Sequence, residues 1–170
     1  MPSDLETTWL AFLAAWDRGD EAGCLAALCA WEATWEERFW ADDFSDFGAI
    51  YHEDVELCDH LGFLGTVDIY RGLDGFRGWR GEAADVASGV QWKPEEFHRL
   101  GGRFALVGPA DLLMRYTRLP FKLTTGGVWT LRDRKIAKVE LYRGRRRILR
   151  ALKRGKDAAL VVRDGDAELD

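Results

Sequence analysis

The chain has 170 residues and a formal net charge of −5, with 47% hydrophobic and 31% charged side chains. This composition is typical of a single soluble globular domain that buries a substantial core. No apolar run approaches the roughly 18 residues of a membrane-spanning helix, and the N-terminal MPSDLETTW lacks the basic and apolar regions of a secretory signal, so we expect a cytoplasmic protein with no membrane partner.

Charge is distributed unevenly along the chain. Residues 1–60 contain fifteen acidic and two basic side chains, whereas residues 61–170 contain fourteen acidic and twenty-two basic ones. Much of the basic excess lies in Arg143–Lys156, which has eight basic residues and no acidic one. Such a segment either meets an anionic partner or forms a solvated C-terminal helix that faces the acidic N-terminal helices of the same subunit or of a neighbour. We favour the second interpretation and expect no nucleic-acid partner, because no nucleic-acid-binding motif accompanies the segment.

The cysteines and histidines predict no metal site. Cys24, Cys29 and Cys58 are odd in number and lack metal-ligand spacing, which suits reduced thiols in a cytoplasm. The three histidines form no metal-ligand pattern either. Because the chain also lacks a glycine-rich phosphate-binding loop and a nucleophile elbow, we expect neither a metal nor a cofactor.

Helices are predicted to come before most of the strands. A capping-box pattern at Ser3 begins a helix that Gly19 ends, Asp20 begins a second helix that reaches about Trp40, and a third helix is predicted within 71–86. Five of the eight tryptophans lie in the first forty residues. Tryptophan-rich helices are either ordinary core or the roof of a pocket for a flat, apolar ligand.

The second half of the chain has the texture of a β-sheet. A first strand over 54–60 is followed by strands over 90–100, 103–116, 119–132 and 135–142, and then by a helix over 145–153. This order predicts an α+β fold: a cone-shaped, strongly curved, mixed or antiparallel sheet roofed by three N-terminal helices, with a short C-terminal helix. We expect one domain over residues 1–154 and an acidic C-terminal tail over 155–170.

The segment DVELCDH, residues 54–60, is the most informative stretch for function. Strand alternation places Val55, Leu57 and Asp59 on one face. A carboxyl group on an apolar face either finds a partner or has its pKa raised by burial, and such groups are suited to proton transfer. The alternative is that the strand ends at Cys58 and Asp59 caps a turn.

Other polar candidates lie on the later strands. His98 is a candidate catalytic residue if it faces the pocket, although a strand histidine is more often a surface group. Tyr116 is a candidate phenol donor to a substrate oxygen, or a packed ring with a solvated hydroxyl. Arg115 either clamps a carboxylate or phenolate, or pairs with Asp111 four residues earlier.

The order of these segments resembles the nuclear transport factor 2-like superfamily, and within it the SnoaL-like proteins and ketosteroid isomerase. The resemblance rests on residues 12–20, 54–59, 70–76, 127–136 and 139–142, and it covers most of residues 4–153. It implies the same cone-shaped fold and a homodimer. It also places Asp59 where ketosteroid isomerase has its general base. Phe12 and Gly127 stand where that enzyme has its two oxyanion-stabilising donors.

We therefore predict a cofactor-independent acid/base enzyme, of isomerase, dehydratase, cyclase or epoxide hydrolase type, that acts on a small hydrophobic molecule. The alternative is a non-catalytic module of the same fold that binds a small ligand or a partner protein. The expected catalytic residues are Asp59, His98 and Tyr116. The expected substrate-binding residues are Phe12, Trp16, Trp40, Leu57, Trp79, Trp92, Arg115, Leu123 and Trp129. A homodimer is further suggested by Val128, Ile136 and Tyr142, which are expected on the convex face of the sheet.

Overall fold

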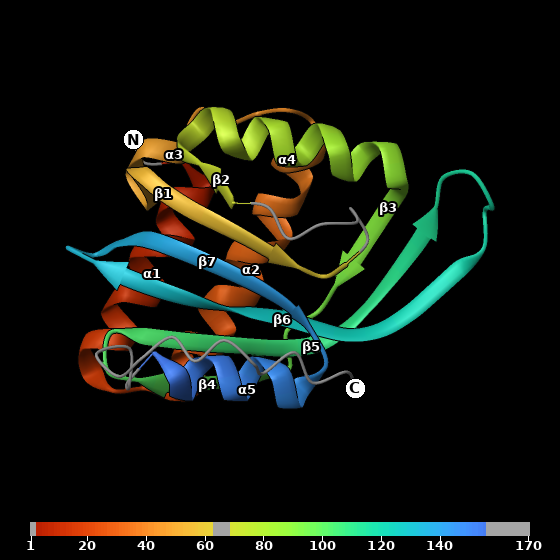
Figure 1. Ribbon diagram of the computed structural model, residues 1–170. Coiled ribbons are helices and arrows are strands. Elements are labelled where there is room, and N and C mark those ends of the chain that lie inside the picture. Colours follow the sequence, from red (N-terminus) through yellow and green to blue (C-terminus); the bar gives the residue numbers. More distant parts are fainter. Residues whose placement is uncertain (1–2, 63–68, 156–170) are drawn as a thin grey trace.

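The computed structural model describes residues 3–62 and 69–155, so the predicted acidic tail lies outside the described residues except for Gly155. Helices and strands follow one another as drawn in Figure 1. Their bounds are α1 (Asp4–Arg18), α2 (Glu21–Trp40), α3 (Phe47–Ile50), β1 (Tyr51–His60), β2 (Ile69–Arg71), α4 (Gly72–Val86), β3 (Ala87–Trp92), β4 (Glu96–Leu100), β5 (Arg103–Met114), β6 (Pro120–Arg132), β7 (Lys135–Arg143) and α5 (Arg145–Arg154).

The strands form one curved sheet in the order β2-β1-β7-β6-β5-β3, with β4 also paired to β5. β1 and β7 run parallel, and the other neighbours are antiparallel. The α+β fold with a strongly curved sheet, N-terminal helices and a short C-terminal helix is therefore confirmed (Figure 1). No helix in the described ranges is long and apolar enough to cross a membrane.

One predicted strand, over residues 90–100, is in fact two strands. The backbone N–H of Lys93 donates to the Pro109 carbonyl oxygen at 3.1 Å, and that of Glu95 donates to the Val107 carbonyl oxygen at 2.9 Å. Between them Pro94 has no N–H to donate to the ladder. As a result β3 pairs with the distal half of β5 and β4 pairs with its proximal half.

The ends of the first two helices are determined by local side-chain chemistry, as predicted. The Ser3 hydroxyl accepts a hydrogen bond from the Glu6 backbone N–H at 3.1 Å, and Asp20 accepts one from the Gly23 N–H at 2.9 Å. Gly19 ends α1 with a φ of 68°, a conformation that costs glycine little. These caps satisfy helix N–H and C=O groups that would otherwise lack partners.

Glycine also allows the strong bend of the sheet. Gly126 in β6 has a φ of 157°, and a Cβ placed on it would lie 1.9 Å from the Leu106 carbonyl oxygen of β5. No side chain fits at that separation, so the close approach of the two strands requires glycine. The bend lies beside Thr125, Trp129 and the other cavity residues of β6.

The two faces of the sheet are covered by different helices. The concave face packs against α1, α2 and α4 around Phe12, Trp31 and Phe104. The convex face is covered by α5, whose Ile148 and Leu152 are buried in a second, smaller cluster. The basic segment thus packs on the side of the sheet opposite the N-terminal helices, so it does not face the acidic helices of its own subunit.

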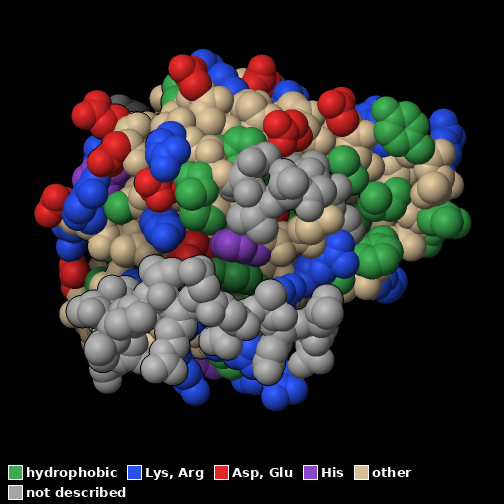
Figure 2. All heavy atoms as spheres, in the orientation of Figure 1, with side chains coloured by type: hydrophobic (Ala, Val, Ile, Leu, Met, Phe, Trp, Pro, Cys, Tyr) green, Lys and Arg blue, Asp and Glu red, His purple; other side chains and the backbone are tan. Residues whose placement is uncertain are grey.

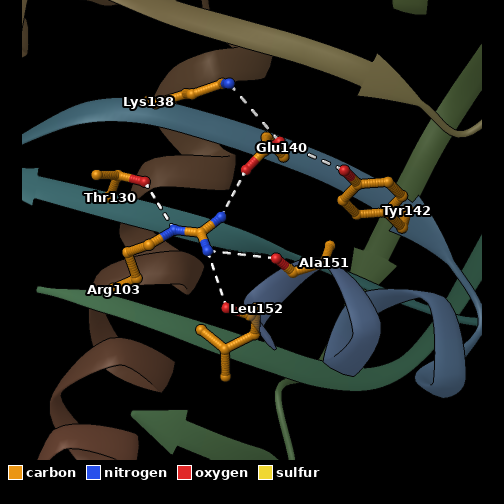
Figure 3. A network of polar contacts seen from close by, with 7 residues as sticks. All are labelled: Arg103, Thr130, Lys138, Glu140, Tyr142, Ala151 and Leu152. Carbon is orange, nitrogen blue, oxygen red and sulfur yellow. Dashed lines mark hydrogen bonds and ion pairs between the residues drawn. The ribbon is translucent and has the colours of Figure 1, made fainter. Parts of the chain in front are cut away.

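A polar network holds α5 on this convex face (Figure 3). The Arg103 guanidinium donates to the carbonyl oxygens of Ala151 and Leu152 at 3.3 and 2.9 Å, and to the Glu140 carboxylate at 3.0 Å. It therefore satisfies carbonyl groups at the end of α5 and brings positive charge to the negative end of the helix dipole.

The packing of α5 also removes our sequence-based reason for a dimer. Val128 and Tyr142 are buried against α5 within a single chain, whereas Ile136, which we expected on the convex face, is buried in the core cluster of the concave face. Exposed apolar side chains gather instead at the hairpin that joins β5 and β6, which projects beyond the rest of the sheet (Figures 1 and 2). These side chains are Leu113, Tyr116, Leu119 and Phe121.

Candidate functional site

A cavity of about 180 Å³ lies between the concave face of the sheet and the helices α2 and α4. Nine aromatic side chains line it: Trp31, Trp35, Phe39, Trp40, Tyr51, Phe76, Trp79, Trp92 and Trp129. The lining also contains three carboxyl groups, those of Glu32, Glu36 and Asp59. It contains no Lys, Arg or His among the described residues. A cavity of this kind is suited to a flat, apolar ligand that carries one or two polar groups.

The α2 wall of the cavity follows from helical periodicity. Leu28, Trp31, Glu32, Trp35 and Phe39 recur at spacings of three and four residues, which places them on one face of the helix. Glu32 is therefore turned inward with the aromatic rings and is only 9% exposed. Glu36, one turn later, lines the cavity as well.

The α4 wall is tied to α2 by an arginine. The Arg80 side chain donates from Nε to the Phe39 carbonyl oxygen at 2.7 Å and from Nη2 to the Trp40 carbonyl oxygen at 2.9 Å. These carbonyls belong to the last turn of α2, and that of Phe39 also accepts a hydrogen bond from the Asp42 backbone N–H at 3.1 Å. The two helices that roof the cavity are thereby held together at one end.

Asp59 lines the cavity from the end of β1. It is 5% exposed, and Val55 and Leu57 on the same face of the strand are buried too. Its Oδ2 accepts a hydrogen bond from the Trp79 indole N–H at 2.9 Å, and its Oδ1 accepts one from the Leu61 backbone N–H at 2.8 Å. The two donors fix the position of the carboxyl group and leave each oxygen a lone pair that can accept a proton.

Glu32 and Glu36 have no such donors among the described residues. Burial raises the pKa of Glu32 to about 8, and the neighbouring Glu36 charge adds to the effect. Burial also raises the pKa of Glu36 to about 7. The pKa of the buried Tyr51 phenol is raised well above its usual range, first by burial and then by the charge of Glu32. The cavity therefore contains carboxyl groups that the protein leaves without a positively charged partner, and Glu32 keeps its proton at neutral pH.

Many of the sequence-predicted site residues do line this cavity. Besides Asp59, they are Trp40, Leu57, Trp79, Trp92, Leu123 and Trp129. Their parent elements α2, α4, β1, β3 and β6 converge on the same space. The sequence analysis missed Glu32 and Glu36. The signal for Glu32 was present, because it occupies an apolar position in the periodicity of α2.

Two of the expected pocket residues belong to the core instead. Phe12 of α1 is completely buried, with its ring 5.1 Å from that of Phe104 and 5.7 Å from that of Trp16. Trp16 in turn lies 6.5 Å from Phe97 and under the Arg99 guanidinium at 3.5 Å. Because α1 packs over β4 and the proximal part of β5, these rings fill the cone away from the cavity lining.

His98, Tyr116 and Arg115 also lie outside the cavity lining. Since Phe97 points into the core, strand alternation turns His98 to the opposite face, where Nε2 lies 2.9 Å from Glu96. Tyr116 lies in the turn after β5 and is 86% exposed. Arg115 donates from Nε to the Ala84 carbonyl oxygen at 2.6 Å near the end of α4. The structure thus separates these three residues from Asp59.

The chain resembles several solved structures. TerC, co-crystallised with polyporic acid, has a TM-score of 0.53 and 20% identity, with 89% of this chain and 99% of that one covered. An NTF2-like protein of unknown function from Burkholderia pseudomallei K96243 has a TM-score of 0.53 and 16% identity, with 89% of this chain and 98% of that one covered. A ketosteroid isomerase-like-fold protein from Catenulispora acidiphila DSM 44928, in complex with trimethylamine, has a TM-score of 0.54 and 15% identity over 68% and 86%.

These likenesses define the fold. The chain has the fold of nuclear transport factor 2-like proteins, which is also that of a ketosteroid isomerase-like structure. No family model matches the chain, and no curated protein matches it. Function must therefore be argued from the cavity, because proteins of one fold perform many different reactions.

Proposed function

We propose that the protein is a cofactor-independent acid/base enzyme that acts on a small, flat, apolar molecule, with Asp59 as the group that takes up the proton. The single observation that supports this most strongly is the placement of the Asp59 carboxyl in the lining of an aromatic cavity. A carboxylate that abstracts a proton must touch the substrate in a site with little water, and it must be held in one orientation.

The surroundings of Asp59 meet these requirements. The Trp79 indole and the Leu61 backbone hold its two oxygens. The cavity walls beside it are apolar side chains such as Leu57 and Leu141. An isomerisation, dehydration, cyclisation or epoxide opening each needs a proton moved to or from a positioned group, and a fixed carboxyl group supplies that step.

The fold neighbours support the small-molecule part of the proposal. One was crystallised with polyporic acid and another with trimethylamine. Both are small organic molecules, and the cavity found here has room for one such molecule.

The proposal can be tested with a nitrobenzisoxazole, a flat apolar probe that a carboxylate base converts by removing the ring C–H proton as the N–O bond breaks, giving a coloured cyanonitrophenolate. The protein should convert it, and Asp59→Asn should lower the rate by about a hundredfold, the usual share of a general base. Asp54→Asn is the matched control, because Asp54 lies on the same strand with an exposed side chain paired to Arg132. Equal rates for the protein and Asp59→Asn would refute the assignment of the base.

The alternative is a non-catalytic ligand-binding module of the same fold. It is favoured by the two hydrogen bonds that already satisfy Asp59 and by the aromatic lining, which needs no chemistry to bind a ligand. The same experiment separates the two functions. A module would bind the probe saturably, as seen by tryptophan fluorescence, without forming the phenolate.

We also propose that the protein is a cytoplasmic homodimer. The three cysteines are free thiols, as in proteins of a reducing compartment. The exposed apolar side chains of the β5–β6 hairpin, including Tyr116 and Leu119, form the kind of surface that a second copy covers.

A further inference from the structure

The polar groups of the cavity differ in whether the protein provides them with partners. Asp59 accepts two hydrogen bonds, from Trp79 and from Leu61. Glu32 is also buried, with 9% of its surface exposed, yet no hydrogen bond or ion pair to its carboxyl group forms among the described residues. A buried carboxyl group without a partner is costly, so its retention in the lining of a cavity indicates that the partner comes from the ligand.

Charge decides what kind of partner is missing. Glu36 lies one helical turn from Glu32 and lines the same cavity, so the two carboxyl groups share one region on α2. The other titratable groups of the lining are Tyr51 and Asp59, and neither is a cation. When Glu32 or Glu36 is ionised, the group that this region lacks is therefore a positive charge with N–H donors.

The aromatic rings around these acids favour the same ligand. Trp31 and Trp35 stand on either side of Glu32 in the sequence of α2, with ring centroids 6.2 Å apart, and Trp31 lies 6.4 Å from Tyr51. Ring faces attract cations electrostatically, and aromatic cages with nearby carboxylates bind ammonium groups in this way. The remaining walls, such as Val90 and Leu112, suit an apolar body.

We propose that the cavity binds an apolar amine, whose protonated nitrogen lies against Glu32 and Glu36 and whose body fills the aromatic space beside Asp59. This inference rests on the proposed function for the idea of a small-molecule cavity, and it names the chemical class of the molecule. A neutral oxygen-bearing ligand is the competing class, because a protonated Glu32 can donate one hydrogen bond to a carbonyl oxygen.

Binding of an ammonium group requires that Glu32 gives up its proton. With the Glu32 pKa at about 8, this costs about tenfold in affinity at neutral pH. A charge-assisted hydrogen bond in a largely apolar site, together with cation–π contacts, is worth more than that. Glu36, Tyr51 and Asp59 face the same space, and their negative or neutral forms do not oppose the ammonium group.

Isothermal titration calorimetry with three matched probes tests the inference. The probes are phenethylamine, phenethyl alcohol, which has nearly the same shape without the charge, and phenylacetone, which carries a carbonyl oxygen. We expect phenethylamine to bind at least about tenfold more tightly than either neutral probe. Glu32→Gln should weaken the binding of phenethylamine by about tenfold or more and change the affinity for phenethyl alcohol by less than about twofold.

Three further variants keep the result interpretable. Glu37→Gln removes the same charge from an exposed position of α2 and should leave all three affinities unchanged. Asp59→Asn should still bind phenethylamine, so loss of turnover in that variant tests the proposed function and not the amine site. Glu36→Gln is the second variant if Glu32→Gln does not fold.

Three outcomes would overturn the inference. One is equal binding of phenethylamine and phenethyl alcohol, and another is absence of phenethylamine binding. The third is tighter binding of phenylacetone with loss of that preference in Glu32→Gln, which would identify Glu32 as a neutral donor to an oxygen ligand. Conversion of the nitrobenzisoxazole could still occur in each case, so the two proposals fail separately.

Discussion

Substitution of Glu32 by glutamine should change how stability depends on pH. The folded protein holds a proton on Glu32 up to its pKa of about 8, whereas an unfolded glutamate loses its proton near the ordinary pKa of 4.5. Between these values the folded state binds more protons than the unfolded state, so the free energy of unfolding falls as the pH rises. Glutamine is neutral in both states and removes this dependence.

The size of the effect follows from the two pKa values. One pKa unit corresponds to about 1.4 kcal/mol. Glu32 therefore lowers the free energy of unfolding by on the order of 4 kcal/mol between about pH 4.5 and about pH 8. Glu32 is buried, so solvent screening does not reduce this figure much. Glu36, whose pKa is about 7, stays in the variant and leaves a smaller slope of the same sign.

Urea unfolding at several pH values measures the effect. The curves for the protein and for Glu32→Gln should lie close together at about pH 5 and diverge toward about pH 8, where the variant is the more stable. Glu37→Gln removes an exposed charge from the same helix, and its free energy of unfolding should follow that of the unsubstituted protein at every pH. Parallel curves for the protein and Glu32→Gln would show that Glu32 is solvated, and the argument from its burial would fail.

Three further predictions concern the fold. Gly126→Ala should destabilise the protein by at least about 2 kcal/mol in urea unfolding, because its Cβ would lie 1.9 Å from the Leu106 carbonyl oxygen. Its control is Gly78→Ala in α4, where no atom lies within 4 Å of the added Cβ, and this variant should stabilise the protein by about 0.5–1 kcal/mol. Equal effects of the two substitutions would contradict the account of the bend. Arg103→Gln should cost roughly 3 kcal/mol, since it leaves Glu140 half-buried without its main partner, and a change below about 0.5 kcal/mol would show that the network is dispensable. Sedimentation should give a dimer that Tyr116→Ser with Leu119→Ser converts to a 19.3 kDa monomer; a mass of one subunit for the unsubstituted protein would refute the dimer.

The local patterns that the sequence analysis used predict most of the fold correctly. The helix caps at Ser3 and Asp20 and the alternation in β1 depend on neighbouring residues, so they can be recognised without tertiary contacts. The strand boundary near Pro94 could not be placed, because it depends on which half of β5 each neighbouring segment pairs with. This pairing depends on the curvature of the whole sheet, which no local sequence pattern shows.

The site was predicted only in part, for a similar reason. Alternation identified the buried face that contains Asp59, but the partner that holds it, Trp79, lies twenty residues further along and reaches it only through tertiary packing. Likewise, aromatic periodicity marked α1 and α2 equally as a possible roof. Only the packing of Phe12 against Phe104 shows that α1 belongs to the core.

On the convex face, the sequence predicted the position of two apolar residues but not what covers them. Val128 and Tyr142 are apolar residues on the outward face of the sheet, and the sequence pattern correctly places them there. The pattern does not show what covers them, and α5 with Ile148 does so within the same chain. A dimer interface and an intramolecular helix bury such residues equally well.

The central claim is that a small flat molecule binds in the aromatic cavity beside Asp59, and the indole N–H signals of the eight tryptophans test it most directly. Six of these residues line the cavity, whereas Trp9 and Trp16 do not. In a nitrobenzisoxazole titration of Asp59→Asn followed by ¹H–¹⁵N NMR, the signals of Trp79, Trp92 and Trp129 should shift saturably. Those of Trp9 and Trp16 should stay in place. Shifts of equal size in all eight signals, or no saturable shift in any, would contradict the account.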